Sequence, residues 1–149
     1  MKMFRTIALP LTLALLANGT VALAADSTSQ VIKRDAPKGI SAAFYACIDK
    51  AGSDTTASAA CLMDEKQKQD ARLNAAYKKL LAKLDSKAKD QLVAAERAWL
   101  DLQGKTGRLE TSLYGDETIS NLQLTQNEIF RLCERANELE KYLSLADDQ

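Results

Sequence analysis

Hydrophobic residues recur every three or four positions along most of the chain, and the longest stretch of this pattern covers residues 56–84. The apolar positions there are Leu62, Leu73, Tyr77, Leu80 and Leu84, with no Gly or Pro between them. This spacing places apolar side chains on one face of an α-helix. We predict one long helix, capped at its start by Asp54 or Thr55.

A second helix is predicted to follow, with Asp85 or Ser86 as its cap. Its apolar positions alternate in steps of four and three, as in the seam between two packed helices: Ala88, Leu92, Ala95, Trp99 and Leu102. Gly104 and Gly107 are expected to end this helix, because glycine weakens a helix interior. Residues 108–114 are ambiguous, and Gly115-Asp116 predicts a turn.

The last part of the chain predicts a third long helix, over residues 118–145. Its inner stripe consists of Leu122, Ile129, Cys133, Ala136, Leu139 and Leu143. A shorter helix is predicted over residues 40–51, with Phe44, Cys47 and Ile48 on one face. No segment alternates in the manner of a strand, so we predict an all-α fold, a small antiparallel bundle with short loops.

The N-terminus has the pattern of an export signal. Lys2 and Arg5 precede an apolar run, and Ala22-Leu23-Ala24 matches the small-x-small site of signal peptidase. The run has about 12 residues, whereas a membrane-spanning helix needs roughly 20. We predict a signal peptide over 1–24, a flexible polar leader over 25–39 and a single helical domain over 40–149. The mature protein is then expected in the periplasm or outside the cell, with no membrane anchor.

Composition excludes several classes of function. The chain has no His, which rules out His-containing triads, His acid/base catalysis and His-ligated zinc. Only 5% of residues are aromatic and the 20 basic residues balance the 20 acidic ones, which argues against nucleic-acid binding. The carboxylate pairs Asp64/Glu65 and Glu134/Glu138 are interpreted as solvent-facing. We therefore expect no enzyme activity, no cofactor and no metal.

Charge is unevenly distributed along the chain. Residues 62–109 carry 11 basic and 7 acidic groups, a net of +4, and residues 110–149 carry 3 basic and 9 acidic groups, a net of −6. One interpretation is that helices of opposite charge attract each other or simply present solvated faces. The other is that the acidic end steers a cationic partner toward the protein.

Three cysteines in an oxidising compartment suggest one disulfide and one remaining thiol. Cys47 and Cys61 lie on either side of a break at residues 52–54, where a hairpin would bring them together. Cys133 lies on the predicted inner stripe and is interpreted as a buried, inert side chain. A redox thiol or a dimer bridge are the alternatives.

One polar group lies next to the apolar stripes of two consecutive helices. Asp70, Leu73, Asn74 and Tyr77 share a helix face, and Arg97 and Trp99 lie on the following helix. We favour a structural lock, in which Asn74 and Tyr77 hydrogen-bond across the hairpin and Trp99 fills the seam. A ligand site is the alternative.

These residues resemble the lysozyme inhibitor LprI-like family. The resemblance runs in order through Cys47 and Cys61, Asp70-x-x-Leu73-Asn74-x-x-Tyr77, Leu92-x-x-Ala95-Glu96-Arg97-Ala98-Trp99 and Arg135-x-x-Glu138-Leu139. The family usually has Gln where this chain has Glu96, and its second disulfide looks absent here. The family consists of small bacterial α-helical proteins, secreted or lipid-anchored, whose named activity is to bind and inhibit lysozyme.

The resemblance implies a lysozyme-binding inhibitor that acts by occlusion, with a cationic lysozyme-type muramidase as partner. Asp116 and Glu117, at the predicted turn, are the candidate contacts, because side chains project freely there. The alternative is an envelope adaptor or structural protein that binds another periplasmic protein through its helical faces.

Overall fold

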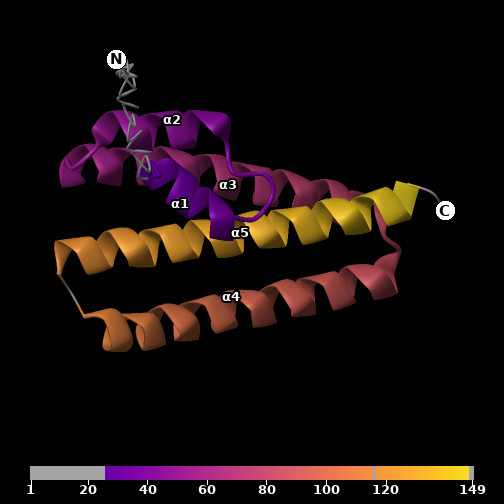
Figure 1. Cartoon of the computed structure of the whole chain (residues 1–149). Coiled ribbons are helices and arrows are strands. Elements are labelled where there is room, and N and C mark those ends of the chain that lie inside the picture. The colour runs from indigo at the N-terminus through magenta and orange to yellow at the C-terminus, as the bar shows by residue number, and fades with distance from the viewer. Residues whose placement is uncertain (1–25, 116, 148–149) are drawn as a thin grey trace, which may run out of the picture.

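The computed structural model describes residues 26–115 and 117–147, so the predicted signal peptide lies outside the described residues. The described chain forms five helices and no strand, which confirms the all-α prediction. The helices are α1 (Thr28–Asp35), α2 (Ala42–Ala51), α3 (Thr55–Lys83), α4 (Ser86–Tyr114) and α5 (Thr118–Asp147) (Figure 1). In this part of the chain, no helix is long and apolar enough to cross a membrane.

Aspartate side chains cap the first turns of α3 and α4. Asp54 accepts hydrogen bonds from the backbone N–H groups of Thr56 and Ala57, at 2.9 and 3.0 Å. Asp85 accepts one from the N–H of Ala88 at 2.8 Å. At each start the aspartate, rather than the hydroxyl residue after it, satisfies the first free N–H groups of the helix.

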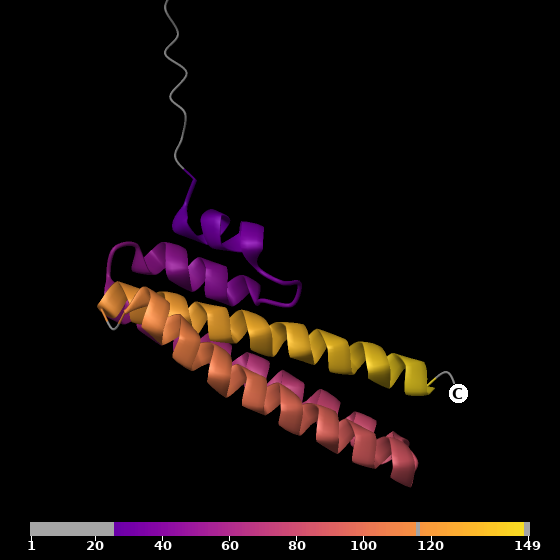
Figure 2. The ribbon, with the colours of Figure 1, turned by 90° about the horizontal axis from the view of Figure 1, so that it is seen from below.

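The core lies mainly between α3 and α5, which run side by side in the same direction (Figures 1 and 2). One cluster of buried residues joins them: Leu73, Ala76, Leu80, Leu92, Leu132, Ala136 and Leu139. A second cluster lies beneath α2 and contains Phe44, Ile48, Cys61, Leu62 and Ile129. The main packing therefore joins α3 to α5, although they are not consecutive, and α4 contributes only Leu92 to these buried clusters among its described residues.

The N-terminal segment differs from its prediction. Residues 25–39 were expected to form a flexible leader, but they contain α1, which packs against α2 (Figure 2). Ser27 and Gln30 form a reciprocal capping box at the start of α1. The backbone N–H and hydroxyl of Ser29 donate to the Asp49 carboxylate at 3.1 and 2.6 Å. The serines that suggested a polar leader therefore cap and dock a short helix.

The fourth helix is longer than predicted, because it continues through Gly104 and Gly107 and includes residues 108–114. An interior glycine costs about 1 kcal/mol relative to alanine. Here the helix is held to α5 on both sides of the glycines, since Gln103 and Glu110 both accept hydrogen bonds from Arg131. Tertiary contacts thus override the local preference to stop.

The chain leaves α4 at Gly115. This residue has φ +82°, a conformation that favours glycine, and its N–H donates to the Thr111 carbonyl at 3.0 Å. The predicted turn therefore begins where expected, while Asp116 lies outside the described residues.

Candidate functional site

Helix α4 directs polar side chains toward the rest of the molecule and most of its leucines toward solvent. The side that meets α3 and α5 carries Leu92, Glu96, Trp99, Gln103 and Glu110. In contrast, Leu102, Leu109 and Leu113 are 57%, 59% and 73% exposed. The predicted seam was therefore wrong at Ala95 and Leu102, which face solvent.

A buried ion pair joins the middle of α4 to α5. The Nε and Nη2 groups of Arg135 donate to Glu96 Oε2 at 3.0 and 2.8 Å, and Nη1 donates to Glu138 at 2.5 Å. The Arg135 guanidinium also lies over the Trp99 ring, 5.9 Å from its centroid. Burial by itself lowers the pKa of Arg135, but the bonds to Glu96 and Glu138 outweigh it, so the pKa is raised. The arginine stays charged and orients α4 against α5.

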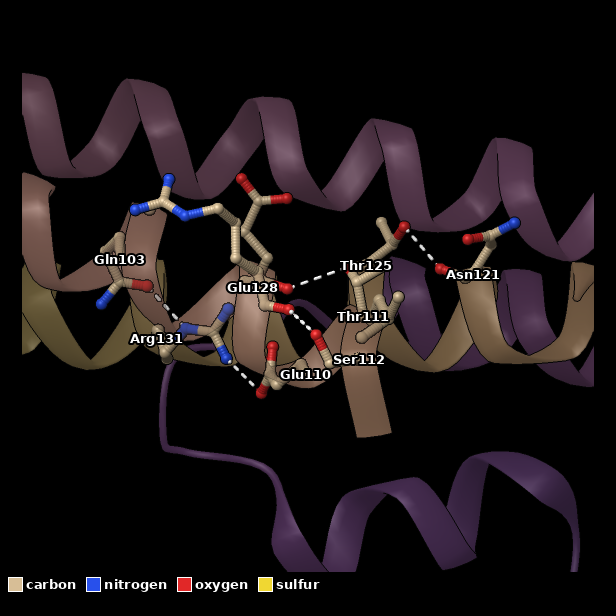
Figure 3. Close-up of a pocket in the computed structure, with 12 residues that line it drawn as sticks. Gln103, Glu110, Thr111, Ser112, Asn121, Thr125, Glu128 and Arg131 are labelled. Atoms are coloured by element: carbon tan, nitrogen blue, oxygen red, sulfur yellow. Dashed lines mark hydrogen bonds and ion pairs between the residues drawn. The ribbon is translucent and has the colours of Figure 1, made fainter. Parts of the chain in front are cut away.

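Arg131 makes a second polar link, nearer the turn between α4 and α5. It donates to Gln103 Oε1 at 2.5 Å and to Glu110 Oε1 at 2.7 Å (Figure 3). These residues line a hollow of about 770 Å³ between the two helices, together with Thr125 and Glu128. Glu110 Oε2 is buried and has no hydrogen-bond partner among the described residues. Buried polar atoms are usually hydrogen-bonded, so the hydrogen bonding of this interface is incomplete.

A second hollow, of about 450 Å³, lies between α3 and α4. It is lined by all six residues that were predicted to form a structural lock: Asp70, Leu73, Asn74, Tyr77, Arg97 and Trp99. The predicted bonds across the hairpin are absent from the described structure. Asn74 Nδ2 instead donates to the Asp70 carbonyl of its own helix at 2.9 Å, and the Tyr77 hydroxyl has no partner there. The six residues converge on an open space and do not lock the helices together.

Trp99 was expected to fill the seam between the helices, but it is only partly buried. It packs against the α3–α5 core cluster and lines the hollow between α3 and α4. It also lines a separate hollow with Arg131 and Arg135. The ring therefore separates two spaces and belongs to the margin of the core.

The predicted disulfide and the predicted buried thiol are both confirmed. Cys47 and Cys61 form a disulfide between α2 and α3, with 5.8 Å between their Cα atoms, and Cys133 is free and buried. The Cys133 thiol lies 3.3 Å from the Lys38 carbonyl and 3.6 Å from Arg72 Nη1. Burial raises the pKa of Cys133 more than Arg72 lowers it. The thiol thus lacks the lowered pKa of a reactive cysteine.

Most of the acidic residues near the C-terminus have partners within the molecule. Three ion pairs join α3 to α5: Lys66–Glu128, Arg72–Glu140 and Lys83–Asp147. Glu110 and Glu138 pair with arginines of α5. Three of these pairs join the basic segment 62–109 to the acidic segment 110–149, which supports the interpretation that helices of opposite charge attract each other. The Glu117 carboxylate is exposed and has no partner among the described residues.

Sequence reasoning missed two polar residues at the centre of the molecule. Glu65 is 0% exposed, not solvent-facing, and its carboxylate accepts bonds from the Ser41 N–H and hydroxyl at 2.9 and 2.5 Å. Gln69 also donates to Glu65, at 2.8 Å. Both residues continue the helical spacing between Leu62 and Leu73. A polar residue on an apolar stripe was the signal that could have identified them.

In the described chain, no group of three or more His, Cys, Asp or Glu residues is arranged to hold a metal ion.

The profile of the family described as "Lysozyme inhibitor LprI" matches residues 47–139, which is more than half of the chain. This range contains the disulfide, both polar links between α4 and α5, and the hollow between α3 and α4. No curated protein and no solved structure gives a significant match.

Proposed function

Since the chain belongs to the LprI lysozyme inhibitor family, we propose that it binds a lysozyme-type muramidase and inhibits it by occluding the active-site cleft. The protein would carry out no chemistry of its own. With the export signal predicted over residues 1–24, it would act in the periplasm or outside the cell. The family match is the observation that carries this proposal.

The geometry favours the connection between α4 and α5 as the occluding element. The two long helices meet there at one end of the molecule (Figure 1). Leu113 and Ile119 are 73% and 66% exposed, and Tyr114 and Glu117 are also exposed. Exposed leucine, isoleucine and tyrosine side chains at one end of the molecule are suited to contact a concave surface of a partner. We call this end the α4–α5 tip, which consists of the described residues 113–115 and 117–119.

The charge of the tip fits a cationic partner. Five acidic residues of the C-terminal third form internal ion pairs: Glu110, Glu128, Glu138, Glu140 and Asp147. Glu117, like Glu134, is exposed and forms no ion pair among the described residues, so its carboxylate is available to an external cation. Asp116 is its neighbour in sequence, and the two remain our candidate contacts. Exposed charges of this kind accelerate the encounter and add salt dependence, but contribute little to folding stability.

The test is an assay of cell-wall lysis by a cationic lysozyme, combined with binding to the immobilised enzyme. The double variant Asp116→Lys/Glu117→Lys should bind about tenfold more weakly at low salt. The matched control is Asp64→Lys/Asp90→Lys, which makes the same charge change on exposed positions of α3 and α4. Raising the salt concentration should weaken the wild type and the control more than the tip variant.

Equal inhibition by the tip variant and the control at every salt concentration would remove the tip from the proposal. Absence of binding to any lysozyme by the wild type would contradict the function itself. The envelope adaptor would then be the better candidate, and it is favoured by the exposed Leu102, Leu109 and Leu113 along α4. Exposed apolar surface of this kind commonly marks protein interaction sites.

A further inference from the structure

The hollow between α3 and α4 is bordered by polar groups that have no partner in the described structure. Neither the Asp70 carboxylate nor the Arg97 guanidinium forms an ion pair there. The Tyr77 hydroxyl and the Trp99 indole N–H also lack hydrogen-bond partners, and Asn74 keeps its side-chain oxygen free. Unpaired donors and acceptors around one concave space are typical of a binding site for a small molecule.

The same hollow has an aromatic and aliphatic wall. Tyr77 and Trp99 border it together with Leu73, Val93 and Leu132. The Arg135 guanidinium, which lies over the Trp99 ring, lines a different hollow. A ligand in the α3–α4 hollow can therefore contact ring surface of Trp99 without displacing the ion pair of Arg135 with Glu96.

The charges of the hollow select the chemistry of the ligand. Asp70 and Arg97 carry opposite charges, and Glu96 is already neutralised by Arg135. A phosphate or carboxylate would meet Asp70, and a purely cationic group would meet Arg97. Two kinds of ligand suit this mixture: a zwitterion, and a neutral molecule whose groups both donate and accept hydrogen bonds. The aromatic and aliphatic wall favours the neutral molecule, provided that it also offers an apolar face.

We propose that the α3–α4 hollow binds a neutral sugar of the N-acetylhexosamine class. Sugar hydroxyls both donate and accept, and the C–H face of a pyranose ring offers a flat apolar surface to Trp99 and Tyr77. The acetamido group adds an amide for the polar border and a methyl group for the Leu73–Leu132 wall. The volume of about 450 Å³ falls within the range of small-molecule sites. This site is separate from the α4–α5 tip and does not depend on lysozyme binding.

The chain provides its own reporter, because Trp99 is its one tryptophan. The full mature protein is titrated with chitotriose, the β-1,4-linked trimer of N-acetylglucosamine, to millimolar concentrations while Trp99 fluorescence is recorded. We expect a saturable change. Dialanine and an oligoarginine peptide are titrated in parallel, because they represent a zwitterion and a cation.

Three variants test the assignment of the site. Asp70→Ala, Tyr77→Phe and Arg97→Ala each remove one polar partner, and each should raise the apparent dissociation constant about threefold to tenfold. The matched control is Arg108→Ala, an exposed arginine of α4 that borders the other hollow and should leave the titration unchanged. Circular dichroism verifies that each variant keeps its helical content, and calorimetry repeats the wild-type titration without relying on fluorescence.

Saturable binding of chitotriose that the three variants weaken and the control preserves would support the proposal. No response to the sugar by either method would overturn it, as would a response that all variants retain. A response to dialanine or oligoarginine alone would overturn the ligand class and identify a peptide site. None of these experiments contains lysozyme, so their outcome is independent of the inhibition assay.

Discussion

Helix α5 contacts both α3 and α4, and it holds them by different means. Toward α3 it presents Ile129, Ala136 and Leu139, which are all 0% exposed. Toward α4 it presents Arg131 and Arg135, which form hydrogen bonds and ion pairs across the interface. Burial of apolar surface stabilises the fold strongly and does not depend on direction. The attraction within a buried ion pair depends on its geometry, and the cost of removing both charges from water largely offsets it. We infer that α3–α5 supplies stability, while polar contacts give α4 its orientation.

The largest effect is expected from disrupting the apolar interface. Leu139→Ala should lower the free energy of unfolding by about 3–5 kcal/mol, because a fully buried leucine leaves a cavity. Denaturant unfolding followed by circular dichroism measures it. The control Leu113→Ala, at a position 73% exposed, should change the stability by less than about 0.5 kcal/mol. Similar losses in the two variants would contradict the placement of the core.

A smaller and more local effect is expected at the polar interface. Glu96→Gln removes the charge opposite Arg135 and retains a hydrogen-bonding oxygen. Because Arg135 still pairs with Glu138, the loss should be about 1–2 kcal/mol. Hydrogen exchange should accelerate in α4 but remain unchanged in the middle of α3 and α5.

Asp90→Asn is the control for this variant, because Asp90 is an exposed acid of α4 without an ion pair among the described residues. It should leave hydrogen exchange unchanged. Uniform acceleration across all three helices in Glu96→Gln would show that α4 is part of the main cooperative unit.

A stabilising change is predicted within α4. A Cβ atom at Gly107 would meet nothing within 4 Å, and the residue lies inside a regular helix. Gly107→Ala should therefore raise the stability by about 0.5–1 kcal/mol, measurable as a higher melting temperature. Gly115→Ala should lower it, because Gly115 has a positive φ of 82°. A loss in Gly107→Ala would mean that α4 does not continue through this position.

The smallest effect concerns pH. A hydrogen bond from Tyr142, followed by contacts with Arg135, keeps the pKa of Glu138 below its usual range. A carboxylate with a lower pKa in the folded state contributes stability at neutral pH and loses it as pH falls through that lower pKa. The loss should be slight, since 45% of the Glu138 side chain is exposed. Hydrogen exchange of α4 below about pH 4 should be less pH-dependent in Glu138→Gln; an unchanged profile would contradict the role of Glu138.

The local features of this fold could be predicted because they depend on neighbouring residues. The spacing of Leu73 and Leu80 defines a helix face, Asp54 and Asp85 supply caps, and the short separation of Cys47 and Cys61 suggests a closed hairpin. Where the prediction failed, a local signal had two meanings. Polar serines suggested a leader but form a capping box in α1, and Gly107 suggested a stop but is spanned by bonds to Arg131.

The sequence by itself therefore determined the four helices α2 to α5, the apolar faces of α2, α3 and α5, the disulfide and the group of residues around Asn74 and Trp99, but not the helix α1. Only the tertiary structure decided that α3 pairs with α5, that α4 turns leucines outward, and that the Asn74–Trp99 group borders a hollow. The physical reason is that helix faces follow from spacing within one segment, whereas partner choice depends on packing summed over the whole chain. On α4, the burial of Glu96 was possible only because Arg135 lies opposite it, 39 residues away in sequence.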